Sequence, residues 1–208
     1  MPTCSACTRW PAPHTAPRCL KRDLLESLPR LNHFFLEHEI PYKLQPGSVN
    51  YEMTYSLTGL WDYVEAVSRA SIGVRLGRQL LHASAPSRRD RLAAFFAAVA
   101  AHEETLAEIL LRRLRDRPDV EFVGLPTPAR STRVPTISFH VPGRPSEEIV
   151  RAVDAEKIGI RFGDFYARRL TDRLGITESG GVVRVSAVHY NTEEEVARAA
   201  DAIVRALG

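Results

Sequence analysis

The stretch that decides the fold covers residues 182–196 and reads VVRVSAVHYNTEEEV. Apolar and polar side chains alternate over its first half, which predicts a β-strand over residues 182–188. Arg184 then lies on the face opposite the apolar side chains. Thr192 followed by Glu195 forms a capping box and marks the start of a helix. The stretch therefore predicts a strand, a short turn and a terminal helix.

The rest of the C-terminal half continues this alternation of strand and helix patterns. We expect strands at residues 120–123, 134–141 and 158–161, a helix at residues 146–157 that is capped by Ser146, and a helix at residues 165–174. Together with the terminal helix, these elements predict a small domain of the α/β (α+β) class at residues 118–208.

One long helix is expected at residues 88–117, between this domain and the preceding chain. Ser87, with Asp90 three residues later, supplies an N-terminal cap, and Pro118 follows the last turn. At 1.5 Å per residue such a helix is roughly 45 Å long, which suits a connector between domains.

The N-terminal part of the chain has a less regular pattern. Residues 21–87 indicate short helices and an extended segment; the helices are expected at 22–28, 31–37 and 53–70, and the extended segment at 40–50 with a loop at Gly47. Residues 1–20 have no hydrophobic period and are interpreted as an irregular arm.

Composition excludes several classes of function. The 208 residues carry 28 basic and 25 acidic side chains, so the net charge of +3 gives no basic stripe for nucleic acid. The longest apolar run, residues 92–101, is about half of the roughly 20 residues that cross a bilayer. No secretion signal is recognisable, so we expect a cytoplasmic protein.

The cysteines are confined to the arm. Cys4, Cys7 and Cys19, together with His14, could hold zinc, but their spacing matches no common zinc module. We therefore assign no metal site, and a zinc-binding adaptor is the weakest of the alternatives.

Two arginines and one loop are the candidate functional residues. Arg184 projects from a rigid strand, and its planar guanidinium can hold both oxygens of a carboxylate. Arg161 stands at a strand-to-helix turn. Gly47, Ser48 and Asn50 precede a helix, where a backbone N–H and a hydroxyl can bind a phosphate. Salt-bridged arginines and ordinary turns explain the same residues, so the patterns alone leave both interpretations open.

Three segments taken in order resemble one family. Residues 45–52 (QPGSVNYE), 158–163 (IGIRFG) and 183–196 (VRVSAVHYNTEEEV) resemble motifs of the aminotransferase class V, or cysteine desulfurase-like, family. Its members are fold-type I enzymes that use pyridoxal phosphate. The resemblance implies that the chain is the C-terminal domain of such an enzyme, with a connecting helix and a remnant of the large domain.

The resemblance also implies roles for particular residues. Arg184, with Arg161 beside it, would bind the carboxylate of an amino-acid substrate. Gly47, Ser48 and Asn50 would contact the phosphate of pyridoxal phosphate across the interface of a homodimer. Where the desulfurase branch has its sulfur-accepting cysteine, this sequence has Tyr166. An aminotransferase, epimerase or lyase is therefore the better analogy.

One departure from the family concerns the Schiff-base lysine. The sequence has three lysines, Lys21, Lys43 and Lys157, and none stands in the family's lysine motif. We therefore expect no catalytic lysine in this chain and no activity of the chain alone. Residues 1–20 occupy the place of that motif, and we hypothesise that they are read out of frame.

Several explanations stay open at this point. The chain is either a frameshifted or split part of an enzyme, with a separately encoded large domain as one partner, or a reduced module that binds carboxylates or proteins without catalysis. Substrate and reaction type are not readable from these residues.

Overall fold

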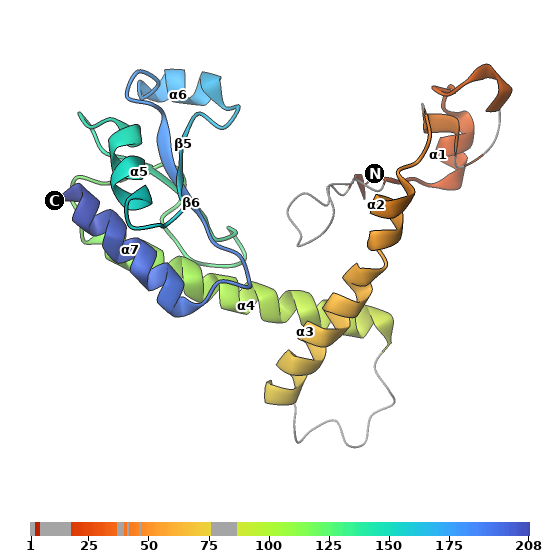
Figure 1. Ribbon diagram of the computed structural model, residues 1–208, viewed down its shortest axis with the longest axis horizontal. Helices are drawn as coiled ribbons and strands as arrows, with labels where there is room; N and C mark the ends of the chain where they lie inside the picture. Colours follow the sequence, from red (N-terminus) through yellow and green to blue (C-terminus); the bar gives the residue numbers. More distant parts are fainter. Residues whose placement is uncertain (1–2, 5–17, 37–39, 41, 46, 76–86) are drawn as a thin grey trace. The chain divides into compact units, whose positions relative to one another are not determined.

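The computed structural model describes residues 3–4, 18–36, 40, 42–45, 47–75 and 87–208 (Figure 1). The chain divides into two compact units, residues 1–95 and 96–208, which are described separately. The boundaries expected from the sequence, at residues 20, 87 and 117, stay a prediction.

The second unit is built on a four-stranded sheet. Its strands are β3 (Glu121–Phe122), β4 (Thr136–His140), β5 (Arg161–Gly163) and β6 (Val182–Ser186). Their order is β3-β4-β6-β5, and each neighbouring pair is antiparallel. The small domain is thus of the α+β type, because its helices accompany an antiparallel sheet and do not connect parallel strands.

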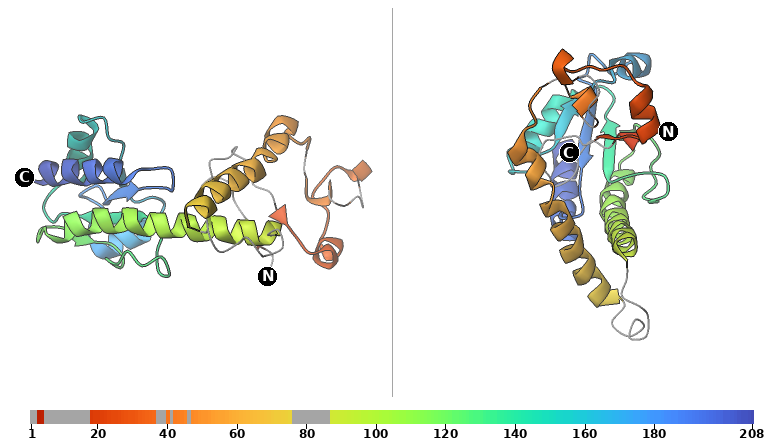
Figure 2. Two further views of the ribbon diagram at one scale, coloured as in Figure 1. Left: turned by 90° about the horizontal axis from the view of Figure 1, so that it is seen from below. Right: turned by 90° about the vertical axis from the view of Figure 1, so that its right-hand side faces the viewer.

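Three helices cover one face of this sheet, namely α4 (Arg88–Arg115), α5 (Ser146–Asp154) and α7 (Glu193–Leu207). The core between helices and sheet includes fully buried side chains from both layers, among them Leu111, Phe139, Ile149, Val183 and Ile203. The C-terminal half of α4 runs beside α7 (Figures 1 and 2), and Arg113 pairs with Asp201 at 2.8 Å. Burial of these apolar faces is the main stabilising contribution to this unit.

The opposite face of the sheet carries polar side chains. Val183 and Val185 are buried against the helices, whereas Arg184 is half-buried and Ser186 exposed. The alternation expected for this strand is confirmed. A short helix, α6 (Arg168–Leu174), lies at the ends of β5 and β6 that are far from α4 (Figure 1).

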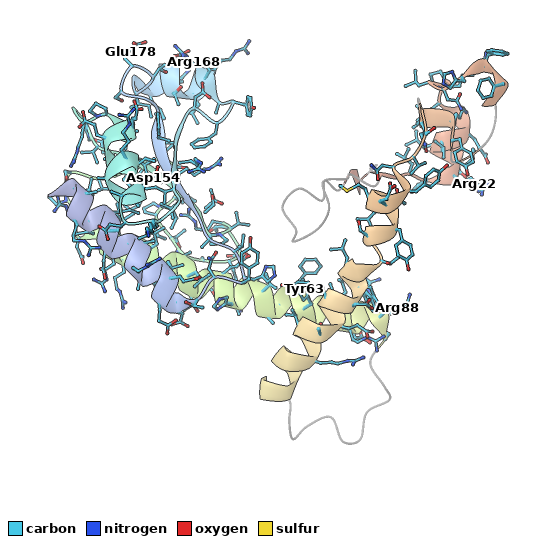
Figure 3. The ribbon with its side chains drawn as sticks, viewed as in Figure 1. Arg22, Tyr63, Arg88, Asp154, Arg168 and Glu178 are labelled. Atoms are coloured by element: carbon cyan, nitrogen blue, oxygen red, sulfur yellow. The ribbon has the colours of Figure 1, made fainter. Side chains whose placement is uncertain are left out.

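The described residues of the first unit form several short helices, one longer helix and one strand pair. The elements are β1 (Thr3–Cys4), β2 (Arg18–Cys19), α1 (Arg22–Ser27), the 3₁₀ turns Phe34–Leu36 and Tyr42–Leu44, α2 (Tyr51–Ser56) and α3 (Gly59–Arg75). Within this unit α3 packs on the first two turns of α4. Tyr63 meets Phe95 edge to face, and Ser68 donates to the Arg91 carbonyl at 3.1 Å; Figure 3 labels Tyr63 and Arg88 in this region.

Two expectations for the first unit are wrong in detail. The single helix expected at 53–70 is two helices, because the Ser56 and Thr58 hydroxyls donate to carbonyls three residues earlier and Gly59 follows. Such side-chain bonds compete with the helical ladder. The segment at 40–50 is not extended throughout, since Tyr42–Leu44 forms a 3₁₀ turn.

Three further differences lie in the second unit. The helix expected at 165–174 begins only at Arg168, because Phe165 and Tyr166 have left-handed backbone angles. Ser146 does not cap α5: Pro145 stands at the cap position, and the Ser146 hydroxyl donates instead to the Gly181 carbonyl at 2.9 Å. The strand expected at 158–161 begins only at Arg161. The helix expected at 31–37 is reduced to the 3₁₀ turn Phe34–Leu36 among the described residues. Cys7, His14 and residue 37 lie outside them.

The N-terminal cap of α7 gives a first stability prediction. Thr192 accepts from the Glu195 N–H at 3.1 Å, and the Glu195 carboxylate accepts from the Thr192 N–H at 3.0 Å. Thr192→Ala should lower the free energy of unfolding by about 1 kcal/mol, because one terminal N–H loses its acceptor. Thr192→Ser keeps the oxygen and should change it little. Urea unfolding of the three proteins checks this, and equal losses in both variants would contradict it.

Candidate functional site

Arg184 stands at the middle of the sheet's polar face. It lies on the inner strand β6, opposite Ser138 on β4 and opposite Arg161 on β5. Side chains directly opposite each other in an antiparallel pair project from the same face. The strand pairing therefore places Arg161 and Arg184 opposite each other in register, on the same face of the sheet.

A turn after β5 places an aromatic ring on Arg184. Gly163, Phe165 and Tyr166 have positive φ angles of 138°, 50° and 65°. The Asp164 carboxylate accepts from the Tyr166 N–H at 2.9 Å, which holds the turn. The Phe165 ring centroid then lies 3.6 Å from the Arg184 guanidinium carbon. This stacked cation–π contact fixes the plane of the guanidinium.

The guanidinium N–H groups of Arg184 have no hydrogen-bond acceptor among the described residues. Within the described part of the chain, no carbonyl or carboxylate accepts a hydrogen bond from its guanidinium. By contrast, Arg117 and Arg205 donate to carboxylates at 3.0 and 2.6 Å. Among the described residues, Arg161 donates to the carbonyl of its neighbour Ile160 at 2.9 Å and to no other acceptor. A half-buried guanidinium held by a ring and without an acceptor suits an anionic ligand.

Two glycines keep the turn close to β6. Gly181 has a φ of 73°, and a Cβ built on it would lie 2.5 Å from the Gly163 carbonyl oxygen. The carbonyl oxygen of Gly181 accepts a hydrogen bond from the Ser146 hydroxyl. This close backbone approach needs glycine and seats the Phe165 turn beside the start of β6.

A cavity of about 290 Å³ opens beside Arg184. It lies between the polar face of the sheet and α6 and is lined mainly by apolar side chains. Helix α6 is anchored by Asp172, whose carboxylate lies 2.6 Å from the Thr177 hydroxyl and 2.9 Å from Arg168. The Thr177 hydrogen bond and then Arg168 lower the pKa of Asp172. Figure 3 shows Arg168 and Glu178 together at this end of the unit.

The cofactor residues expected from the sequence lie in the other unit. Gly47, Ser48 and Asn50 are exposed in the segment before α2. The Asn50 side-chain oxygen accepts from the Met53 N–H at 2.8 Å, so this residue caps α2. The Ser48 hydroxyl and the Asn50 amide N–H₂ group fit a phosphate as donors.

The three lysines have distinct surroundings. Lys43 is only 8% exposed, and its ammonium donates to the Leu25 and Glu26 carbonyls at 3.0 and 2.7 Å. These carbonyls are at the C-terminal end of α1, where a cation is stabilising. Lys21 and Lys157 are exposed. Lys43 therefore serves as a structural cap, a role that the sequence did not predict.

A second group of titratable residues lies where β6 leads into α7. The His102 Nε2 atom is 2.8 Å from the Asn191 carbonyl oxygen. Burial raises the pKa of Glu103, against the lowering effects of the His189 backbone and of His102. Burial, followed by the charge of His102, lowers the pKa of His189. None of these residues lines the Arg184 cavity.

Two absences hold for the residues that the structure describes. They include no cluster of three histidine, cysteine, aspartate or glutamate residues able to hold a metal ion. None of their helices is long and apolar enough to span a membrane.

Comparison with known sequences gives one family. A model of the family described as aminotransferase class-V matches residues 92–199. The chain is similar to the aminotransferase-like protein FGM3 of Gibberella zeae, with 43% identity over 100 residues, which are 48% of this chain and 25% of that protein. It is similar to a cysteine desulfurase of Haloferax volcanii, with 34% identity over 105 residues, which are 50% of this chain and 23% of that protein.

Comparison with solved structures agrees on the fold. The structure of the cysteine desulfurase CsdA of Escherichia coli is similar to this one, with a TM-score of 0.64 and 20% identity. The match covers 93% of this chain and 42% of the CsdA chain. The matched region thus spans about a quarter of each curated relative named above and under half of this solved structure.

Proposed function

We propose, because this chain belongs to the aminotransferase class-V family, that it is the C-terminal part of a pyridoxal-phosphate-dependent enzyme acting on amino acids. The observation that carries the proposal is Arg184, a guanidinium held in plane by Phe165 and given no acceptor within the described chain. We assign to Arg184 the binding of the substrate carboxylate.

The chemistry of Arg184 supports this assignment. A guanidinium offers parallel N–H donors at the spacing of two carboxylate oxygens, so one ligand can satisfy both. Because the ring covers one of its faces, the N–H edge is the position left for a ligand. Arg161 lies directly opposite on β5 and on the same face of the sheet, so it is the second arginine assigned to the substrate carboxylate.

The cofactor would be held partly by the first unit. The Ser48 hydroxyl and the Asn50 amide are exposed donors that would contact its phosphate, with the backbone N–H of Gly47 nearby in sequence. When bound, pyridoxal phosphate acts as the electron sink for bonds at the substrate's α carbon. In this proposal the residues of this chain bind and orient the substrate and the phosphate.

The lysine that holds the cofactor is proposed to come from outside this sequence. The Lys43 ammonium already donates hydrogen bonds to two carbonyls. Lys21 and Lys157 are exposed on the surface. Activity would then need a lysine-bearing large domain, and a homodimer would bring Ser48 to the cofactor of the neighbouring subunit.

The reaction is proposed not to use a cysteine persulfide. Tyr166 occupies the corresponding turn, where it is fully exposed. A phenol cannot form a persulfide, so transamination, epimerisation or elimination fits these residues better than desulfuration. The finer choice depends on groups outside this chain.

A second candidate is a carboxylate-binding module without catalysis. The observation that favours it is that Arg184, Phe165 and the adjoining cavity belong to one unit with its own hydrophobic core. Carboxylate recognition therefore needs no cofactor. Gene context separates the two candidates, because a neighbouring reading frame for the large domain favours the enzyme.

The lysine assignment is tested by chemical labelling. The purified chain is mixed with pyridoxal phosphate, reduced with borohydride and digested, and labelled lysines are mapped by mass spectrometry. We expect low, scattered labelling at Lys21 and Lys157 and protection of Lys43, because its ammonium is buried. Stoichiometric labelling of one lysine, with turnover of amino acids, would overturn the proposal that the lysine lies elsewhere.

A further inference from the structure

We propose that the cavity beside Arg184 selects carboxylates that carry an apolar chain of about four to six carbons. The inference rests on the proposed function, because it assigns the side-chain pocket of the same substrate site. The cavity lies entirely within the second unit, so it can be tested with this chain alone.

Six of the ten residues that line the cavity are apolar, and its two charged residues, Arg184 and Asp164, have opposite signs. Val123, Phe165, Leu170, Leu174 and Val182 supply most of the lining, and Arg184 stands among them.

Three polar residues accompany Arg184 in the lining, namely Ser138, Asp164 and Thr171, and the last two have partners within the protein. The Asp164 carboxylate accepts from the Tyr166 N–H, and the Thr171 hydroxyl donates to the Arg168 carbonyl at 2.9 Å. The cavity therefore combines an apolar wall with a guanidinium that still has donors to satisfy. That combination fits an anion attached to an apolar body.

Two leucines on α6 form the part of this wall most accessible to a ligand. Leu170 and Leu174 are one helical turn apart, and each is 47% exposed. Side chains four residues apart share one face of a helix, so both line the cavity together. Covering them removes apolar surface from water, which favours ligands with an apolar chain.

The size of the cavity limits the ligand. At about 290 Å³ it is at the lower limit of the roughly 300 to 1,000 Å³ found for small-molecule sites. It therefore suits a short chain and excludes large ring systems. Each fully buried methylene raises affinity about fourfold. Four half-buried carbons should thus give at least about a tenfold preference over acetate.

The test measures binding of simple carboxylates to the full 208-residue chain by NMR. Acetate, 4-methylpentanoate and the neutral 4-methylpentanamide are titrated to about 20 mM while the Arg184 side-chain N–H signal is followed. We expect 4-methylpentanoate to bind at least about tenfold more tightly than acetate, and the amide to bind much more weakly than the acid. Straight-chain acids should gain affinity with length and then level off as the cavity fills.

Variants locate the preference. Leu170→Ser combined with Leu174→Ser should bring the ratio between the two acids to within about threefold and leave acetate binding in place. The matched control is Leu125→Ser, an exposed leucine outside the cavity, which should keep the full preference. Because Leu170 and Leu174 are half-exposed, we expect the double variant to fold. The series of straight-chain acids tests the pocket without any variant.

The outcomes separate this inference from the proposed function. If acetate and 4-methylpentanoate bind equally well and both depend on Arg184, the inference of an apolar pocket is wrong, whereas carboxylate binding by Arg184 is supported. A preference that survives in the double leucine variant places the pocket elsewhere and overturns the inference. If neither acid shows binding that is lost in Arg184→Gln, the assignment of carboxylate binding to Arg184 is wrong, and the proposed function loses its main support.

Discussion

Arg184→Ala is expected to lower kcat/KM for amino-acid substrates by about 30-fold to several thousand-fold in an enzyme that joins this chain to a lysine-bearing domain. The range corresponds to a cost of about 2 to 5 kcal/mol when a buried charge pair loses one partner. Arg184 is half-buried, stacked on Phe165 and without an acceptor in the described chain, so its removal leaves the substrate carboxylate unpaired.

The controls for this prediction separate charge from geometry. Arg184→Lys keeps the charge and loses the planar fork, so it should restore only part of the rate. Arg112→Ala removes an exposed arginine on α4 and should leave kcat/KM within about twofold. Steady-state kinetics on the three variants decide the matter, and an unchanged kcat/KM in Arg184→Ala would remove this residue from the substrate site.

Local patterns in the sequence were sufficient to predict β6 and the N-terminal cap of α4. The alternation at 182–188 placed Arg184 on the polar face, which burial in β6 confirms. The helix start at Ser87 is confirmed by its hydroxyl, which lies 2.6 Å from the Asp90 carboxylate and accepts from the Asp90 N–H. These features depend on residues within a few positions of one another, and that range is what periodicity and capping rules describe.

Contacts that depend on tertiary approach were not predictable in the same way. The contact between Phe165 and Arg184 requires a left-handed backbone at two non-glycine residues, which residue preferences do not indicate. The position of Ser146 predicts a local helix cap, but its hydroxyl donates to the Gly181 carbonyl, 35 residues away. Lys43 likewise reaches carbonyls of a helix 17 and 18 residues earlier. In each case the partner is fixed by the fold and not by spacing.

The largest stability effect outside the core is expected at Gly181. Gly181→Ala should lower the free energy of unfolding of the second unit by about 2 to 4 kcal/mol. Its φ of 73° disfavours any side chain, and the new Cβ would lie 2.5 Å from the Gly163 oxygen and 2.6 Å from its carbon. Both atoms belong to backbone, so β5 must move away from β6. Urea unfolding followed by circular dichroism measures the loss.

Gly175 provides a matched control because it has the same backbone conformation without the close approach. Its φ is 71°, it ends α6, and nothing lies within 4 Å of a Cβ built there. Gly175→Ala should therefore cost only the left-handed conformation, about 1 kcal/mol. Displacing β5 also moves the Phe165 turn, so Gly181→Ala should weaken acetate binding at Arg184 while Gly175→Ala should not. Equal stability losses in the two variants would show that the clash at Gly163 is relieved without cost and that the turn is not held by this approach.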